Sequence, residues 1–216
     1  HLHLPLAPEH IFCYDICKQT TTQKGRCFMM GHGERLIFHI DVNSAFLSWT
    51  AIDQLQKAKE TDTLDSYVDL RDIPSIIGGD SATRHGIVLA KSIPAKKYGI
   101  STAEPIASAL KKCPSLVIAS PDHHSYSAHS HALMEFLSGY CPVIEQVSID
   151  ECYMDYTPIC RDFESPQAAA TIIKDSVRKT FGFTVNVGIS DRKVLAKMAS
   201  DFKKPDLVHT LYAKEI

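Results

Sequence analysis

The order of apolar segments along the chain limits its fold more than any other feature. A strand is predicted over 35–42, where Leu36, Phe38, Ile40 and Val42 alternate with the residues of a second face. Helices are predicted over about 44–59 and 125–139, and 143–157 is predicted to form a strand, a tight turn and a second strand. A helix over 165–182, a last strand over 183–190 and a last helix over 191–202 complete the order.

The part of the chain between about 46 and 121 has a pattern of its own. It contains a short apolar run (73–79), a predicted strand (85–93), a short predicted helix (102–113) and a further short strand (116–120). When this part is set aside, the remaining order is strand, helix, strand, strand, helix, strand. That is the βαββαβ order of a ferredoxin-like sheet, so the predicted fold class is α+β with a small inserted domain.

This topology brings three carboxylates together. The first and third strands of a ferredoxin-like sheet are central neighbours and run antiparallel, so the end of the first strand lies beside the start of the third. Asp41 is at that end, and Asp150 and Glu151 are at that start, in the stretch VSIDECYMDY. An acidic pair at a turn is common and means little alone, but a third acidic residue nearby suggests a site.

Composition and charge exclude several classes of protein. The chain has 216 residues, 44% hydrophobic and 22% charged, with a net charge of −2, which is ordinary for a globular protein. No apolar run reaches the roughly 18 residues of a membrane helix, and the N-terminus lacks the layout of a signal peptide. Seven irregularly spaced cysteines indicate reduced thiols and a cytoplasmic location.

The cysteines and histidines do not favour a zinc site. Residues 1–33 are predicted to be a loosely ordered extension, and its candidate ligands lack the paired spacing of zinc sites: Cys13, Cys17, Cys27 and His32. Four further histidines in or beside the helix over 125–139 are expected to form a polar helix face rather than a metal site: His123, His124, His129 and His131.

Basic residues are concentrated in two stretches. Residues 84–112 contain six lysines and arginines against one acid, and residues 192–204 contain five against one. Such stretches either form a local anion site or are solvated helix faces. Clustered carboxylates repel one another and persist near neutral pH when a divalent cation neutralises them. Carboxylates together with basic side chains therefore point to phosphoryl or nucleotidyl transfer.

Four blocks of sequence, in order, resemble the Y-family (DinB/UmuC-type) translesion DNA polymerases. They are FHIDVNSAF, IPSIIGGDSATRHGIVLAKSIPAKKYGI, VSIDECYMDY and VGISDRKVLAKMASDFKKPD, and the resemblance covers roughly 34–212. It implies a palm at 34–45 and 122–212 and fingers at 46–121, with thumb and little-finger domains expected beyond residue 216. It also implies DNA-directed DNA synthesis on primer-template DNA from dNTPs, with two Mg²⁺ ions, for which Mn²⁺ could substitute. A sliding clamp is a further candidate partner, through the expected C-terminal part.

The resemblance also implies roles for individual residues. Asp41, Asp150 and Glu151, together with the backbone carbonyl of Val42, match the metal ligands of the family. Phe46 matches the steric gate, a bulky ring that excludes a ribose 2′-hydroxyl, although a core aromatic is the alternative reading of this residue. Lys96 and Lys204 match the basic residues that bind the triphosphate.

The sequence departs from the family pattern at several of these positions. Lys96 stands where an arginine is usual, and a lysine cannot form the bidentate fork of an arginine. Ile93 stands where a tyrosine is usual, which removes one phosphate contact. Asn43 and Ser44 replace a more usual acidic and aromatic pair.

Two other functions fit part of the pattern. A nucleotide or diguanylate cyclase also carries carboxylates on a palm-like sheet, and the sequence contains a Gly-Gly-Asp at 78–80. That motif precedes a basic loop, however, instead of forming a hairpin turn. A catalytically inactive, polymerase-like DNA-binding protein would not need the three carboxylates, all of which are present.

Overall fold

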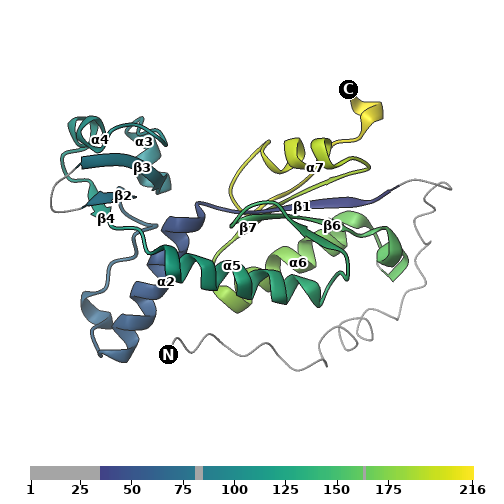
Figure 1. Ribbon diagram of the computed structural model, residues 1–216, viewed down its shortest axis with the longest axis horizontal. Helices are drawn as coiled ribbons and strands as arrows, with labels where there is room; N and C mark the ends of the chain where they lie inside the picture. The colour runs from purple at the N-terminus through teal and green to yellow at the C-terminus, as the bar shows by residue number, and fades with distance from the viewer. Residues whose placement is uncertain (1–34, 81–84, 163) are drawn as a thin grey trace. The chain divides into compact units, whose positions relative to one another are not determined.

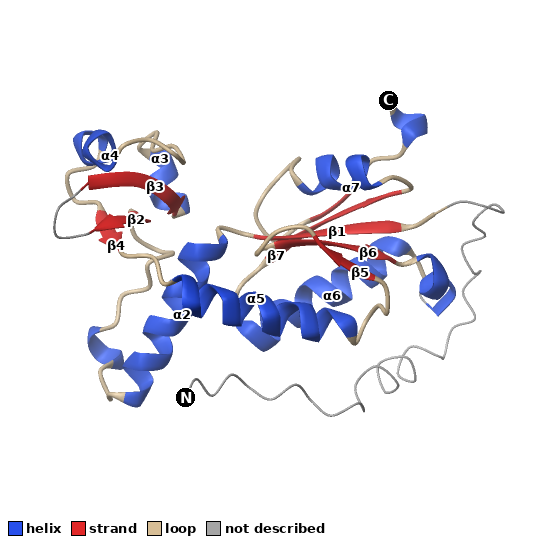
Figure 2. Ribbon diagram, viewed as in Figure 1, coloured by secondary structure: helices blue, strands red, loops and turns tan. Residues whose placement is uncertain are grey.

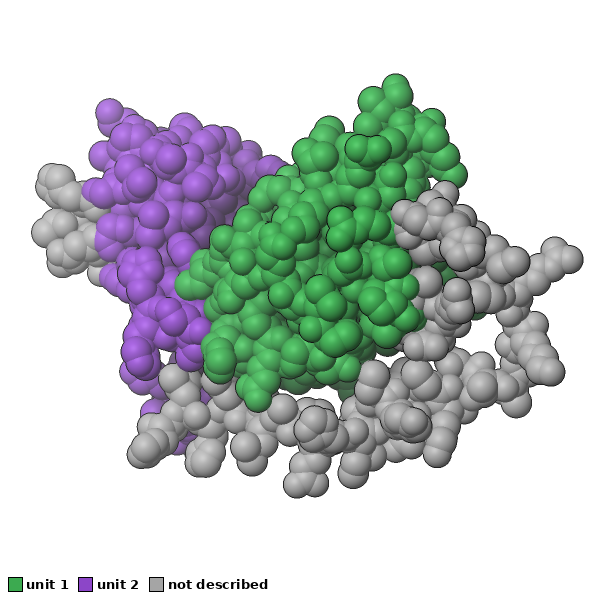
Figure 3. Space-filling view, turned by 45° about the vertical axis from the view of Figure 1, so that its right-hand side comes forward, with its two compact units in different colours: residues 1–43, 130–216 green, residues 44–129 purple. Residues whose placement is uncertain are grey.

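The computed structural model describes residues 35–80, 85–162 and 164–216, and the chain divides into two units (Figure 3). One unit, the sheet unit, comprises the described residues up to Asn43 and those from Ser130 to Ile216. The other, the insert unit, comprises Ser44 to His129. The candidate zinc ligands of the N-terminal extension, and Arg84 of the first basic stretch, lie outside the described residues.

A five-stranded sheet forms the centre of the sheet unit, in the order β5-β6-β1-β7-β8 (Figure 1). The strands are β1 (Ile37–Val42), β5 (Ile144–Gln146), β6 (Glu151–Asp155), β7 (Val185–Ser190) and β8 (Val208–Thr210). β1 pairs antiparallel with both β6 and β7. The four strands that come first in the chain, β1, β5, β6 and β7, thus have the ferredoxin-like order. The predicted pairing of the first and third of these strands, β1 and β6, is confirmed.

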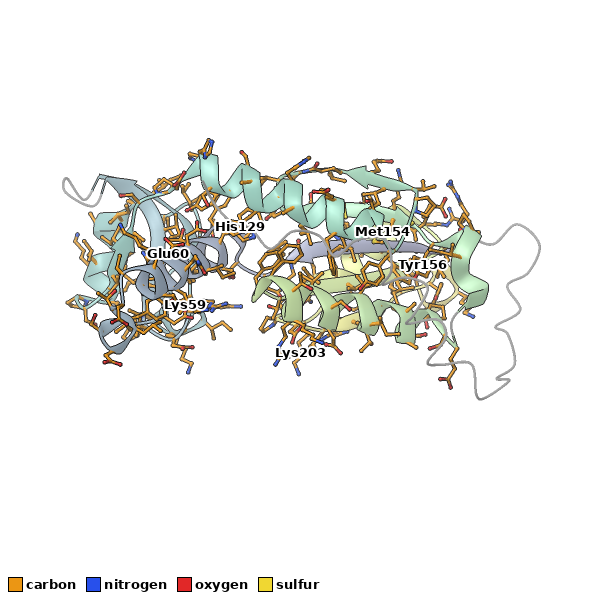
Figure 4. All side chains as sticks on the ribbon, turned by 90° about the horizontal axis from the view of Figure 1, so that it is seen from below. Lys59, Glu60, His129, Met154, Tyr156 and Lys203 are labelled. Carbon is orange, nitrogen blue, oxygen red and sulfur yellow. The ribbon has the colours of Figure 1, made fainter. Side chains whose placement is uncertain are left out.

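Helices cover both faces of this sheet (Figure 2). α6 (Pro166–Phe181) and the part of α5 (His123–Ser138) that belongs to this unit lie on one face, and α7 (Lys193–Ser200) lies on the other. Buried apolar side chains fill the α6 side, where Phe38 and Tyr156 stack with ring centroids 4.5 Å apart. Met154 and Tyr156, labelled in Figure 4, are both almost fully buried.

The polar face of the first strand is directed toward α7. His39 and Asp41 alternate with the apolar residues of β1, and the Nδ1 atom of His39 lies 2.8 Å from Ser200 Oγ, at the end of α7. The close approach of α7 depends on Gly188 in β7, because a Cβ atom there would overlap the carbonyl oxygen of Ala196. A glycine at this position thus places a helix directly over the polar strand face.

Local sequence signals account for the ends of α6. Ser165 is the N-cap and its hydroxyl accepts a hydrogen bond from the backbone N–H of Ala168, while Pro166 is the first helical residue. Gly182 ends the helix in the left-handed conformation with a φ of 77°. These predicted helix boundaries are confirmed.

A three-stranded sheet in the order β3-β2-β4 organises the insert unit. Its strands are β2 (Ser75–Asp80), β3 (His85–Lys91) and β4 (Val117–Ala119), and its helices are α2 (Ala45–Glu60), α3 (Ile93–Lys97), α4 (Ile106–Lys112) and the first two turns of α5. One apolar cluster lies between this sheet and α4, and includes Ile76, Val88, Ile106 and Ala109. A second joins α2 to β2 through Leu47, Ala51 and Ile77.

Three short 3₁₀ helices (Leu64–Ser66, Thr157–Asp162 and Ala213–Glu215) complete the described elements.

The structure corrects three predictions about elements and burial. The strand at 183–190 is not the last, because β8 follows it and pairs parallel with β7. The strand predicted over 85–93 ends at Lys91, and an unpredicted short helix, α3, begins at Ile93. His129 was expected on a polar helix face, but it is buried, stacks on Trp49 and lies 2.8 Å from Asp53, whereas the other three histidines are exposed.

Among the described residues, no helix combines the length and the apolar character that a bilayer crossing requires.

Candidate active site

Backbone pairing places the three predicted carboxylates at one end of the central strands. Asp41, the last residue but one of β1, is the register partner of Glu151, the first residue of β6. The backbone N–H of Val42 donates a hydrogen bond to the carbonyl oxygen of Asp150, at 3.0 Å. The turn is closed by the N–H groups of Val147 and Ser148, which both donate to the carbonyl oxygen of Glu151. The sheet therefore fixes the backbone of all three acidic residues.

Asp41 is largely buried and paired with a lysine. Its side chain is 19% exposed, and Lys204 Nζ donates a hydrogen bond to Asp41 Oδ1 at 2.8 Å. Burial raises the pKa of Asp41 above its usual value, despite the opposing effect of Lys204. The same lysine contacts Asp201 at 2.9 Å. Burial alone would lower the pKa of Lys204, but the two carboxylates raise it overall.

Glu151 is held by two basic side chains. Lys197 Nζ contacts Oε1 at 2.8 Å and Oε2 at 2.6 Å, and His39 Nε2 lies 3.2 Å from Oε2. Burial alone would raise the pKa of Glu151, but the hydrogen bond and charge of Lys197, together with His39, lower it overall. Burial is the main cause that lowers the pKa of His39, so desolvation favours the neutral imidazole.

Asp150 is partly buried at the turn, where its carboxylate accepts a hydrogen bond from Ser148 Oγ at 2.6 Å. It also contributes to the electrostatics of its neighbour, because its negative charge is one of the causes that raise the pKa of Asp41. Asp41, Asp150, Glu151 and Lys204 are thus brought together in the sheet unit.

The donor chemistry of this strand end fits a divalent cation. Carboxylate and carbonyl oxygens are the ligands that Mg²⁺ prefers, and the burial that raises the pKa of Asp41 is a cost that a bound cation would offset. In the described parts of the chain, however, no three acidic, histidine or cysteine side chains are gathered closely enough to hold a metal ion. Lysine ammonium groups supply the positive charge at Asp41 and Glu151 instead.

Phe46 and Lys96 lie in the insert unit. Phe46, in the first turn of α2, is partly buried and stacks on Tyr126 of α5 with ring centroids 4.6 Å apart and an interplanar angle of 9°. The hydroxyl of Tyr126 lies 2.8 Å from Thr50 Oγ1, which fixes the ring beneath Phe46. Lys96 is exposed in the last turn of α3, and Ile93, at the first position of that helix, is 54% exposed.

The Gly-Gly-Asp at 78–80 has a structural explanation. It ends β2, the central strand of the small sheet, and a Cβ atom on Gly78 would overlap the carbonyl oxygen of Ile87 in the neighbouring strand. Close packing between two strands accounts for the glycine at that position.

Two residues around the carboxylates were not predicted, namely Lys197 and His39. Each had a signal in the sequence, because His39 alternates with the apolar residues of β1 on the same strand face as Asp41, and Lys197 belongs to the second basic stretch. Neither signal identifies a partner, since Lys197 and Glu151 are 46 residues apart.

Comparison with known proteins identifies the family of this chain. The model of the impB/mucB/samB family matches residues 40–201. The chain belongs to this family. This confirms the resemblance to the Y-family polymerases, and the matched range contains Asp41, Asp150 and Glu151.

Curated Y-family relatives are similar over most of this chain. A protein named DNA polymerase IV from Clostridium acetobutylicum is 50% identical over 182 residues, which are 84% of this chain and 44% of the relative. A DNA polymerase IV from Alkaliphilus oremlandii is 36% identical over 181 residues, which are 84% of this chain and 42% of the relative. The chain therefore spans less than half the length of these relatives.

The fold is shared with a solved Y-family structure. DinB from Sulfolobus solfataricus superposes with a TM-score of 0.69 at 25% sequence identity, over 84% of this chain and 49% of the DinB chain. The two proteins thus share the fold over most of the present chain.

Proposed function

We propose that this chain is the palm and fingers part of a translesion DNA polymerase, which adds dNTPs to a primer 3′ end by two-metal nucleotidyl transfer. One observation carries the proposal most directly: the register that pairs Asp41 with Glu151 at the end of a ferredoxin-like sheet. The relatives named DNA polymerase IV support the same reaction. The palm would comprise 34–45 and 122–212, and the fingers 46–121.

The carboxylates would bind the metal ions of this reaction. Asp41, Asp150, Glu151 and the carbonyl of Val42 would hold Mg²⁺, with Mn²⁺ as a substitute. Bound divalent cations supply activation of the attacking hydroxyl and charge neutralisation at the leaving pyrophosphate. Lys197 and Lys204 pair with these carboxylates and would supply positive charge near the nucleotide.

The remaining predicted residues would select and hold the nucleotide. Lys96 and Lys204 would bind the triphosphate as point charges. The ring of Phe46, fixed by its stack on Tyr126, would exclude a ribose 2′-hydroxyl. Primer-template DNA and dNTPs are the proposed substrates. Binding of a sliding clamp beyond residue 216, and a cytoplasmic location, remain predictions.

A chimaera tests this function. Residues 34–212 would replace the matching part of the Clostridium acetobutylicum DNA polymerase IV, which supplies the rest of a polymerase, and primer extension with Mg²⁺ would be measured. Asp41→Ala, Asp150→Ala and Glu151→Ala should each reduce the rate of nucleotide addition by several orders of magnitude, because each removes an oxygen ligand of the metal ions. DNA affinity should change little.

Asp175→Ala is the matched control, because Asp175 is an acidic residue of α6 whose side chain is 59% exposed and contacts Lys174. It should extend primers at the parental rate. Extension at the parental rate by the Asp150→Ala chimaera would refute the metal assignment. A folded chimaera that binds primer-template DNA but adds no nucleotide would identify the chain as an inactive, DNA-binding member of the family.

A further inference from the structure

Two buried asparagines connect the end of β1 to the segment that carries Lys204. Asn43 follows β1 and is 8% exposed, and Asn186 in β7 is fully buried. The side-chain amide of Asn43 donates to Asn186 Oδ1 at 3.1 Å. The departure from the usual acidic residue at position 43 therefore has a structural consequence, since a carboxylate could not donate this hydrogen bond.

The two amides bind the backbone on both sides of Lys204. Before it, Asn186 Nδ2 donates to the carbonyl oxygens of Ser200 at 3.0 Å and Lys203 at 2.7 Å. After it, the backbone N–H of Asp206 donates to Asn43 Oδ1 at 2.9 Å, and that of Leu207 donates to Asn186 Oδ1 at 3.3 Å. The segment 200–207 is thus held at four backbone groups.

The far side of this segment is also anchored. Asp206 has a φ of 62°, in the left-handed region that is unfavourable for most residues other than glycine. Its carboxylate contacts Lys174 Nζ and Arg178 Nη1, both at 3.0 Å and both on α6. These contacts and the amide of Asn43 together hold a backbone conformation that would otherwise relax.

We propose that Asn43 and Asn186 are positioning residues for Lys204, which set the backbone so that its ammonium group reaches Asp41 and the bound nucleotide. The part that concerns the nucleotide rests on the proposed function. A lysine side chain is long and flexible, so the position of its charge depends on where its backbone is fixed. Small displacements of a binding group reduce catalytic efficiency strongly.

A purely structural role predicts a different result. Buried amides are generally hydrogen-bonded, and the loss of such a bond destabilises a protein wherever it lies. A structural asparagine would therefore lower the stability of the sheet unit as a whole, with no particular effect on Lys204. A positioning asparagine would release the segment 200–207 while the rest of the sheet stays intact.

The experiment measures amine modification of Lys204 and amide hydrogen exchange in the present chain. Lys203 and Lys59 are exposed internal references within the same sample (Figure 4). Asn43→Ala should increase the modification rate of Lys204 relative to Lys203 by about fivefold or more, because it removes three side-chain hydrogen bonds. The amides of Asp206 and Leu207 should exchange faster, while those of β1 and β6 should not.

Two further variants separate the roles. Asn43→Asp can still accept hydrogen bonds from Asp206 and Thr184, so it should keep the Asp206 amide protected and restore most of the slow modification of Lys204. Thr184 lies outside the segment 200–207, and Thr184→Val removes its hydrogen bond to Asn43. The hydrogen bonds to the segment stay, so Lys204 should react at the parental rate. If Asn43→Ala does not fold, Asn43→Ser, which also removes the side-chain amide, takes its place. An unchanged Lys204 rate, or equal acceleration of exchange in all strands, in Asn43→Ala or Asn43→Ser would overturn the positioning role.

The nucleotide provides a separate readout. Mg²⁺ and a dNTP should protect Lys204 from modification in the parent chain, and Asn43→Ala should weaken that protection. If Lys204 is released in Asn43→Ala while no dNTP protects it in the parent, the positioning of Lys204 stands and its proposed contact with the triphosphate fails, whereas the polymerase function is decided by the chimaera. If dNTP protection is equal in parent and variant, the function stands and the positioning role for the nucleotide is wrong.

Discussion

Lysines next to the candidate metal ligands explain how three carboxylates coexist at one strand end. Lys197 contacts both oxygens of Glu151, and Lys204 contacts Asp41. Each ammonium group reduces the repulsion that neighbouring carboxylates exert on one another. If these oxygens hold Mg²⁺ as proposed, Lys197 and Lys204 would compete with the cation for them.

Phe46 offers a test at a single residue. In the chimaera, Phe46→Val should lower the preference for dNTPs over rNTPs by about tenfold or more, because a smaller side chain no longer excludes the 2′-hydroxyl. The measurement is the ratio of kcat/KM for dNTP and rNTP. Tyr126→Phe is the control, since it keeps the ring beneath Phe46 and removes only the hydroxyl that contacts Thr50. It should leave the ratio unchanged.

A purely structural role of Phe46 predicts a different result. Phe46 also packs against the apolar cluster of Leu47, Ala51, Leu70 and Ile77. Truncation of a core aromatic residue costs about 3–5 kcal/mol and would impair the use of both sugars alike. An unchanged ratio with a large fall in Tm would assign Phe46 to the core.

At the scale of elements, long periodic segments were predictable and short ones were not. Helix α6 carries a capping serine, a proline at its first position and a terminal glycine, so both of its ends follow from the sequence. β8 has three residues and exists because it pairs with β7, and α3 has five residues that include Pro94. Neither is long enough for periodicity to appear, so tertiary contacts decide their conformation.

The interaction between α2 and α5 illustrates a feature that no local pattern reveals. Asp53 of α2 accepts hydrogen bonds from Ser125 Oγ at 2.5 Å and contacts His129 Nε2 at 2.8 Å, both on α5. His129 also stacks on Trp49, with ring centroids 5.9 Å apart. His129 was predicted to lie on a polar helix face, but it is buried. Its partner Asp53 lies 76 residues earlier in the chain, so no local pattern identifies the contact.

Acid should weaken this helix contact. Burial alone would raise the pKa of Asp53, but the hydrogen bonds from His129 and Ser125 outweigh it and lower the pKa overall. A lowered pKa in the folded state gives stability above the unfolded value of about 4, which is lost as the pH falls through the folded pKa. Asp53→Asn should therefore lower the free energy of unfolding by about 1–2 kcal/mol near pH 7. The difference from the parent should shrink below pH 4.

Denaturant unfolding at several pH values measures this difference. Asp62→Asn is the control, because Asp62 is an exposed carboxylate that follows the same helix, and its unfolding free energy should match the parent at every pH. A difference between Asp53→Asn and the parent that stays constant from pH 3 to pH 7 would show that the charge of Asp53 does not contribute.

For the whole molecule, sequence order alone predicted that distant residues would become neighbours. Setting the insert aside gave the sheet topology, and the topology placed Asp41 beside Glu151, 110 residues later, as the register confirms. The asparagine pair was not predictable in this way. Asn43 was noted only as a departure from the family, because its partners are a β7 side chain and a loop backbone that no periodicity identifies.

The last prediction concerns Lys96, which belongs to the insert unit, and Lys204, which belongs to the sheet unit. If both bind one triphosphate, Lys96→Ala and Lys204→Ala in the chimaera should each raise the KM for dNTP by about tenfold, since a charge-assisted hydrogen bond contributes roughly 1.5–3 kcal/mol. The affinity for primer-template DNA should change little. Steady-state kinetics and DNA binding, measured on the same preparations, check both quantities.

The double variant and a control complete this test. Because the two lysines would act on the same ligand, the double variant should raise the KM by at least the larger single effect, and any departure from the product of the two effects measures their coupling. Lys97→Ala, which changes the exposed lysine adjacent to Lys96 on α3, should leave the KM within about twofold, the effect expected of a surface substitution. A uniform loss of DNA affinity with an unaltered KM would instead make Lys96 and Lys204 contacts to the DNA backbone, and that affinity would then fall with rising salt.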